Sequence, residues 1–309
     1  MKLYSKSGNK LQSVTKESFK LEKDIQNLIE NNLDEIFGLE FVKSEFGIQG
    51  FRFDTLCFDN ESNSFVIIEY KKGSSYSVID QGYTYLSVLL NNKSDFILEF
   101  NELKDKYLKR DEIDWSQSRV IFISPKFTDY QKNSVNFKNV PFELWEITNF
   151  DNNHIGLTQI SSNSEVDISS TIPLDESKPN VVKQVSYEVK VYSEDYLINK
   201  SVNRPDWIIE KYNDLRQRIM DLGDVVIKPN GKYLSFRNKR PFVDIVFYNS
   251  GIYTILNMKE GTLNDPNNLM KSFNGKGHWG NGDYHVTIDQ NTDLNYLMFL
   301  IKQSFDDKL

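Results

Sequence analysis

The stretch FRFDTLCFDNESNSFVIIEYKK, residues 51–72, decides the fold of the first half of the chain. Its two runs of β-branched and aromatic residues, 51–58 and 65–71, predict two strands. The polar run DNESNS (59–64) between them consists of residues that favour turns. The stretch therefore predicts a β-hairpin whose second strand is apolar enough to be buried.

Helical and strand-like segments alternate around this hairpin. Apolar residues recur at helical spacing over 18–36, a helix that Gly38 is expected to end, and Ser77 is the expected N-cap of a helix over 77–92. Further elements are expected at 40–46 (strand), 100–110 (helix), 119–123 (strand) and 142–148 (strand). Strands interspersed with helices indicate an α/β sheet.

The second half has the pattern of an α+β domain. Pro205 and Gly223 delimit a predicted helix over 205–222. Strands are expected at 224–228, 231–237, 242–248, 251–257 and 284–288. A final helix is expected at 293–305.

The length of 309 residues suggests two domains. Residues 161–185 are short of aromatic side chains and rich in Ser, Asp and Pro, which predicts a linker between domains at 1–160 and 186–309. The net charge of −7 comes from residues 1–185, because 186–309 hold 16 basic and 16 acidic residues. Binding to nucleic acid therefore requires local basic or metal-bearing surface.

Composition excludes several kinds of protein. The single cysteine, Cys57, excludes a disulfide framework and a cysteine zinc cluster. No apolar run approaches the roughly 18 residues that span a bilayer, and the N-terminus lacks a signal-peptide pattern. We therefore expect a cytoplasmic protein that has no membrane partner.

Four polar residues in and after the hairpin are the candidate catalytic set: Asp54, Glu69, Lys71 and Gln81. Side chains alternate across a strand, so Glu69 and Lys71 are expected on one face and Tyr70 on the other. Asp54 is expected to approach Glu69 only if the sheet bends or the hairpin register shifts. Gln81 belongs to the first turn of the next helix, where it can face the end of the strand.

Two carboxylates beside a lysine suit chemistry at a phosphodiester. Carboxylates are hard oxygen ligands for Mg²⁺ or Mn²⁺, and the backbone carbonyl of Tyr70 is a candidate further ligand. A bound metal stabilises charge on the phosphate and lowers the pKa of a bound water, while the lysine orients that water or stabilises the transition state. The alternative is that Lys71 and Lys72 are solvated charges with Glu69 as their ion-pair partner. An unpaired carboxylate directly after the apolar run would be costly, which argues against that alternative.

This order of residues resembles the PD-(D/E)XK nuclease superfamily, in which an Asp precedes a strand ending in Glu-x-Lys and a helix that carries Gln. The segments FRFDTLCFD, FVIIEYKKG and DQGYTYL are similar to the RecB-like and NucS-like branch. The resemblance covers about residues 17–125, and Phe53 stands where the superfamily usually has Pro. It implies a restriction-endonuclease-like mixed sheet flanked by helices, followed here by a smaller α+β domain.

The resemblance also implies roles for individual residues. Asp54 and Glu69 would bind Mg²⁺ or Mn²⁺, and Lys71 would act on the attacking water. Gln81 and Glu22, the latter on the preceding helix, would position DNA, metal or water.

Two segments of the second half carry another resemblance: DWIIEKYNDLRQRIMDLGDVVIKPNGKYLSFRNKRPFVDIVFY and GKGHWGNGDYHVTI. Over about residues 186–306 they are similar to a small prokaryotic domain of unknown function that often follows nuclease-like domains. This resemblance brings no catalytic residues. Arg237, Lys239 and Arg240, in a predicted turn, are candidates for contact with a nucleic-acid backbone, although turns are commonly charged. Lys72 is a further candidate for such contact.

Two classes of function fit these observations. The first is a metal-dependent nuclease acting on DNA, whose C-terminal domain selects substrate or mediates assembly, in restriction, defence or repair. The second is a non-catalytic nucleic-acid-binding or protein-assembly module on a retained nuclease-like fold. The sequence does not separate DNA from RNA, and a homo-oligomer is compatible with either class.

Overall fold

The chain forms two compact units that divide between Val191 and Tyr192. The computed structural model describes residues 2–72, 77–104, 107–161, 164, 166, 181–201, 204–273 and 280–308. The predicted linker over 161–185 lies for the most part outside the described residues. Helix α6 (Val181–Glu188) overlaps its end, and Val185 of this helix is buried in a core of the first unit.

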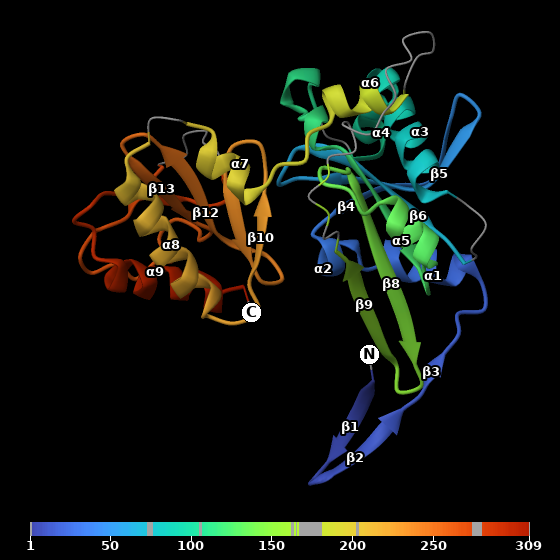
Figure 1. Cartoon of the computed structure of the whole chain (residues 1–309), viewed down its shortest axis with the longest axis horizontal. Helices are drawn as coiled ribbons and strands as arrows, with labels where there is room; N and C mark the ends of the chain where they lie inside the picture. The colour runs from blue at the N-terminus through green and yellow to red at the C-terminus, as the bar shows by residue number, and fades with distance from the viewer. Residues whose placement is uncertain are drawn as a thin grey trace. The chain divides into compact units, whose positions relative to one another are not determined.

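A seven-stranded mixed sheet forms the centre of the first unit (Figure 1). Its strand order is β3-β8-β7-β6-β5-β4, with β9 also paired to β8. The strands are β3 (Lys16–Glu17), β4 (Glu40–Ile48), β5 (Phe51–Asp59), β6 (Ser64–Tyr70), β7 (Arg119–Ser124), β8 (Phe142–Phe150) and β9 (His154–Ile160). Because β6, β7 and β8 are parallel, their carboxyl ends meet at one edge of the sheet.

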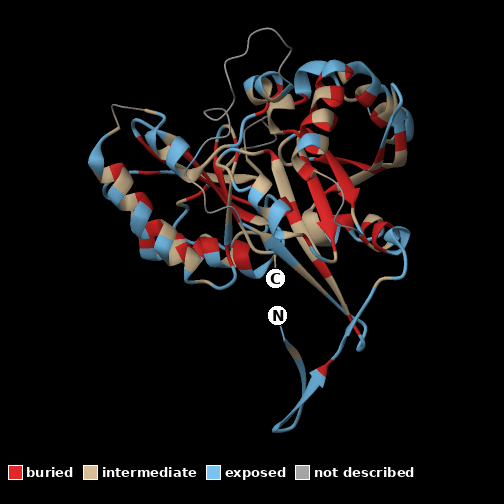
Figure 2. Ribbon diagram, turned by 45° about the vertical axis from the view of Figure 1, so that its right-hand side comes forward, coloured by how far each residue is buried: buried red, intermediate tan, exposed pale blue. Residues whose placement is uncertain are grey.

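Helices cover both faces of this sheet, and the buried residues lie between the layers (Figure 2). Helices α1 (Glu22–Glu30) and α2 (Leu33–Phe37) cover the face that carries Val66, Ile68 and Tyr70. Helices α3 (Val78–Asn91) and α4 (Lys93–Lys104) cover the face that carries Phe65 and Ile67. A short helix, α5 (Asp129–Ser134), connects β7 to β8. The mixed sheet flanked by helices confirms the predicted class of the first half.

Two predicted helices differ from the observed ones. The helix expected over 18–36 is two helices, because Asn32 leaves helical backbone angles, and Gly38 ends the second one at a φ of 65°. The helix expected over 100–110 is α4, which begins at Lys93 and ends at Lys104. Burial decides its position, since Phe96 and Phe100 lie one turn apart and pack against the aromatic side chains of β4, β5 and β6.

The second unit is an antiparallel sheet with helices, which confirms the predicted α+β class. Its strand order is β10-β11-β12-β13-β15-β14. The strands are β10 (Val226–Pro229), β11 (Leu234–Arg237), β12 (Pro241–Tyr248), β13 (Gly251–Leu256), β14 (Lys271–Ser272) and β15 (Tyr284–Ile288). Helices α8 (Asp206–Met220) and α9 (Leu294–Asp306) share one hydrophobic core with this sheet, and α7 (Glu194–Asn199) precedes them. Across both units, no helix of the described residues is long and apolar enough to cross a membrane.

A buried ion-pair network joins three strands at the edge opposite the carboxyl end of β6. Arg119, at the start of β7, donates to Asp59 of β5 at 2.9 Å and to Glu143 of β8 at 2.8 Å. The side chain of Asp59 is 2% exposed and that of Arg119 is 16% exposed.

We expect Arg119→Met to destabilise the protein by about 3–5 kcal/mol, because it leaves the Asp59 carboxylate buried without its cation. Arg218→Met is the control, since Arg218 pairs with Asp214 at an exposed position where an ion pair contributes about 1 kcal/mol or less. Denaturant unfolding measures both losses. Equal losses in the two variants would contradict this account of the network.

Candidate active site

The hairpin brings Asp54 close to the end of β6. The pairs between β5 and β6 run from Asp59–Ser64 to Thr55–Ile68 without a shift, and pairing ends there. Phe53 packs against Tyr85 on the α3 side, whereas Thr55 bonds the Tyr70 hydroxyl on the α1 side. The strand β5 therefore departs from regular alternation at Asp54.

Glu69 is a buried carboxylate with one occupied and one unoccupied oxygen. The residue is 5% exposed, at the carboxyl end of the fully buried strand β6. Its Oε1 accepts hydrogen bonds from Lys71 Nζ at 2.7 Å and from Gln81 Nε2 at 2.8 Å. Its Oε2 is buried and has no hydrogen-bond partner among the described residues. A buried acceptor without a partner costs on the order of 1–3 kcal/mol, so this oxygen suits a ligand.

Asp54 shares the environment of Glu69. Its Oδ2 accepts a hydrogen bond from the backbone N–H of Tyr70 at 2.9 Å. Burial, followed by the negative charge of Glu69, raises the pKa of Asp54 to about 7, against the opposing effects of the Tyr70 hydrogen bond and Lys71. Asp54 is therefore less readily ionised than a carboxyl group in water.

Helix α3 brings Gln81 to the end of β6. Its N-cap Ser77 accepts a hydrogen bond from the backbone N–H of Asp80, as predicted, and Gln81 follows in the first turn. Gln81 Nε2 also donates to the hydroxyl of Tyr85 at 2.7 Å. Its Oε1 is buried and unpartnered among the described residues, so Gln81 offers an acceptor beside Glu69. Tyr85 is a further residue of the site that was not predicted, and its signal in the sequence is its position one turn after Gln81 on the same side of the helix.

Helix α1 is attached to β5 at Asp54. Gln26 is buried, and its Nε2 donates to the backbone carbonyl of Asp54 at 2.8 Å and to Ser44 Oγ at 3.0 Å. Glu22 is exposed one turn earlier, and its charge contributes to the raised pKa of Asp54. Gln26 is thus a positioning residue that the sequence analysis did not identify, and its signal is a polar residue on the apolar side of an amphipathic helix.

The remaining predicted residues lie around or apart from this cluster. The Tyr70 side chain faces the layer of α1 and α2, opposite Glu69 as predicted. Lys72 is exposed, and its Nζ donates to the backbone carbonyl of Lys20. Arg237, Lys239 and Arg240 lie in and beside the turn between β11 and β12 of the second unit, as predicted.

The acceptor groups at this end of β6 are the ones that could hold a cation. In the described ranges, no three side chains of His, Cys, Asp or Glu gather as a metal site. The groups that could bind a cation are the Asp54 carboxylate, Glu69 Oε2 and the carbonyl of Tyr70. Mg²⁺ commonly binds in this way, through one or two carboxylates and several waters.

Comparison with known proteins identifies one full-length relative. An uncharacterized protein of Haemophilus influenzae is 43% identical over 310 residues, which cover 99% of this chain and 100% of that protein. Residues 199–308 match the family described as "Domain of unknown function (DUF5655)". This match confirms that the second half contains a domain of unknown function.

Solved structures give only weak superpositions. A repair endonuclease from Pyrococcus abyssi is 18% identical at a TM-score of 0.26, over 43% of this chain and 50% of that one. EndoMS in apo form is 20% identical at a TM-score of 0.26, over 38% of this chain and 43% of that one. SfsA of Pyrococcus furiosus in complex with Ca²⁺ is 13% identical at a TM-score of 0.23, over 54% of this chain and 76% of that one. The chain thus spans half or less of the two endonucleases, and TM-scores of this size carry no functional assignment.

We expect Asp54→Asn to stabilise the metal-free protein increasingly as the pH rises. Between pH 4 and 7 the folded parent holds a proton that the unfolded chain releases, so its free energy of unfolding falls with pH by up to about 1.4 kcal/mol per unit. Asparagine does not titrate, so between pH 5 and 8 the free energy of unfolding of the variant rises relative to that of the parent by about 1–3 kcal/mol.

Denaturant unfolding in EDTA at several pH values measures this difference. The exposed Asp111→Asn variant is the control for the loss of one carboxylate. A difference between Asp54→Asn and the parent that does not change with pH would contradict the raised pKa.

Proposed function

The chain belongs to the family of that Haemophilus influenzae protein, and we propose that it is a metal-dependent nuclease that hydrolyses phosphodiester bonds in DNA. The observation that carries the proposal is the unpartnered, buried Oε2 of Glu69 beside Asp54 and Lys71. DNA as the substrate follows from the resemblance of the motif, and RNA is the alternative substrate.

Asp54, Glu69 and the carbonyl of Tyr70 would hold Mg²⁺ or Mn²⁺. When bound, the metal stabilises negative charge on the phosphate and lowers the pKa of a bound water. The Tyr70 N–H fixes the rotamer of Asp54 through Oδ2, and Gln81 fixes that of Glu69 through Oε1. Both carboxylates are therefore oriented before a cation arrives.

Lys71 is the cation of the site. Its side chain is 12% exposed, and its partner in the site is Glu69 Oε1 at 2.7 Å. A partly desolvated ammonium interacts more strongly with a developing negative charge than one in water does. Lys71 would thus orient the attacking water or stabilise the charge of the transition state, while Gln81 and Glu22 would position DNA, metal or water.

The C-terminal unit would select substrate or mediate assembly. Lys239 and Arg240 are exposed at the turn between β11 and β12, where they could reach a nucleic-acid backbone. Lys72 would add a contact beside the catalytic cluster. Restriction, defence or repair are the processes that such an enzyme would serve.

We expect Lys71→Ala to lower the rate of DNA cleavage by at least about 100-fold, because it removes the ammonium that would orient the water or stabilise the charge of the transition state. The assay uses plasmid, linear and single-stranded DNA and labelled RNA, with Mg²⁺, Mn²⁺ or EDTA. Lys302→Ala is the control, because Lys302 is an exposed lysine of α9 that pairs with Asp306 one turn away in the same helix. Equal cleavage by Lys71→Ala and the parent would exclude this site, and cleavage of RNA alone would change the substrate.

We expect Mn²⁺ to raise the Tm of the parent by about 2–8 °C at millimolar concentration, since a ligand that binds only the folded state stabilises it. Asp54→Ala should lose this shift, and Asp111→Ala should keep it. This measurement separates the nuclease from a non-catalytic module on the same fold, which needs no metal. A parent without any Mn²⁺ shift would favour the non-catalytic module.

A further inference from the structure

The first strands of the chain form a hairpin without a hydrophobic core. Strands β1 (Leu3–Ser7) and β2 (Lys10–Val14) pair only with each other, as a separate two-stranded sheet. All their residues are exposed except Leu3 and Val14, and the hairpin extends beyond the end of the β8–β9 pair (Figures 1 and 2). An isolated hairpin is marginally stable in water, so this arm, residues 2–14, is a segment expected to gain order from a partner.

The arm has a defined base and a defined turn. Thr15 and Asp151 exchange two hydrogen bonds that involve their backbone N–H groups, and β3 then pairs with β8. At the far end, Gly8 and Asn9 form a two-residue turn in which Gly8 has a φ of 58°, as the first turn residue of type II′ hairpins does. The arm is thus a projecting ribbon that is attached at one end.

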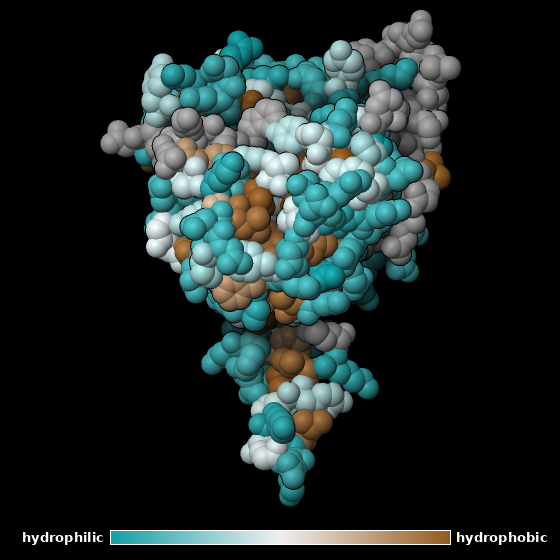
Figure 3. All heavy atoms as spheres, turned by 90° about the vertical axis from the view of Figure 1, so that its left-hand side faces the viewer, coloured by the Kyte–Doolittle hydropathy of each residue, from teal (hydrophilic) through white to brown (hydrophobic). Residues whose placement is uncertain are grey.

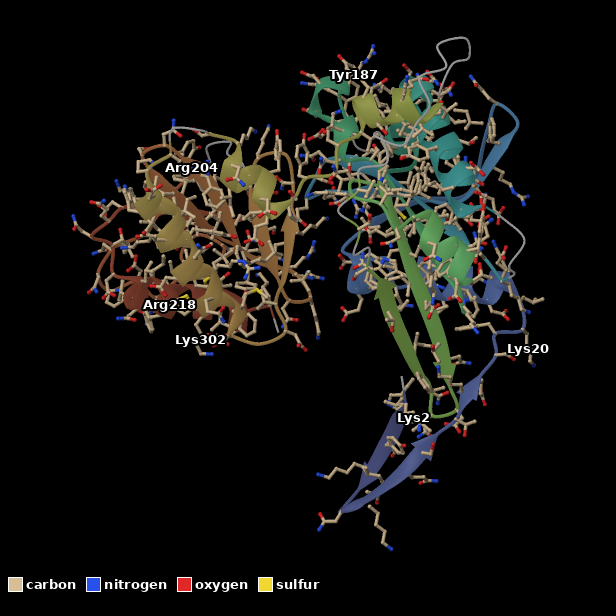
Figure 4. The ribbon with its side chains drawn as sticks, viewed as in Figure 1. Lys2, Lys20, Tyr187, Arg204, Arg218 and Lys302 are labelled. Carbon is tan, nitrogen blue, oxygen red and sulfur yellow. The ribbon has the colours of Figure 1, made fainter. Side chains whose placement is uncertain are left out.

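The arm is basic in an acidic chain. Residues 2–14 hold three lysines and no acidic residue, whereas the whole chain has a net charge of −7. Lys2, Lys6 and Lys10 are exposed, and within the described part of the chain none of the three forms an ion pair. Figure 4 labels Lys2 at the start of the arm and Lys20 beyond its base.

One face of the arm combines positive charge with exposed ring and aliphatic surface. The register pairs Lys6 with Leu11 and Tyr4 with Ser13, so these four side chains share a face, whereas Lys10 pairs with Ser7 and lies on the opposite face. Tyr4 is 48% exposed and Leu11 is 66% exposed. Figure 3 shows the projection as mainly hydrophilic, with apolar atoms between the polar ones.

We propose that the β1–β2 arm binds the phosphate backbone of a nucleic-acid duplex, through Lys2, Lys6 and Lys10. The proposal rests on the proposed function for the identity of the polyanion. A two-stranded ribbon fits the major groove of duplex DNA, and lysines neutralise phosphates without reading sequence. The arm would thus supply the local positive surface that an acidic nuclease needs to hold its substrate.

The competing occupant is a strand of a second copy, added to an edge of the ribbon. Lysines on edge strands oppose such addition, because pairing with another strand would bring their charged side chains next to those of that strand. The lysines therefore favour a polyanion over another chain.

The test is binding of the full-length protein to a fluorescent duplex of about 25 base pairs, measured by anisotropy in EDTA between about 50 and 200 mM salt. We expect Lys2→Gln/Lys6→Gln/Lys10→Gln to weaken binding at least about 10-fold and to reduce the slope of log K against log salt by about 2–3. Lys2→Arg/Lys6→Arg/Lys10→Arg should bind as the parent does. Lys109→Gln/Lys190→Gln/Lys259→Gln removes the same charge from exposed positions outside the arm and is the matched control.

Several results would overturn the proposal. They are unchanged binding by the arm variant, an equal loss in the control, or a parent that binds no duplex. A change of oligomeric state in the arm variant, with duplex binding intact, would assign the arm to contact between copies. EDTA prevents metal-dependent cleavage, so binding and cleavage are tested separately. If the arm variant loses duplex binding but the parent cleaves no nucleic acid, the proposed nuclease activity is wrong and the role of the arm stands. If cleavage depends on Lys71 but the arm variant binds the duplex as the parent does, the role of the arm is wrong and the nuclease activity stands.

Discussion

The desolvation of Glu69 is the constraint on which the candidate site depends. A carboxylate at the end of a strand that is buried on both faces needs compensation, and Lys71 and Gln81 supply it at only one of its two oxygens. Asp54, which the hairpin brings close to the end of β6, adds a second carboxyl to the same environment, which raises its pKa. A divalent cation would compensate both groups together, so the electrostatics of the fold and the proposed chemistry have the same origin.

The layers around the sheet convert this local cluster into a fixed geometry. Helix α3 presents Gln81 to Glu69 from one side, and α1 binds the backbone of Asp54 through Gln26 from the other. The parallel pairing of β6 with β7 places Lys71 N–H on the carbonyl of Ile123 at 2.8 Å, which holds the strand end in place. At the far edge, Arg119 joins β5, β7 and β8. Buried acceptors without a described partner therefore lie at the carboxyl end of β6, whereas the polar groups at the other end are paired by Arg119.

Local patterns in the sequence predict most of this arrangement, and long-range packing accounts for what they miss. Turn residues between two apolar runs predict the β5–β6 hairpin, and the order of Asp54, Glu69, Lys71 and Gln81 predicts their assembly. The position of α4 depends on the burial of Phe96 and Phe100 against other strands. The β1–β2 arm has almost no buried face, so no hydrophobic period marks it in the sequence.

The most direct test of the central claim is anomalous diffraction from crystals of the protein grown with Mn²⁺. The account predicts a peak at coordination distance, about 2.0–2.3 Å, from the carboxylate oxygens of Asp54 and Glu69, and predicts that Asp54→Ala crystals lack it. A well-ordered site without a peak, or a peak at other residues only, would contradict the assignment of these two carboxylates as the metal ligands.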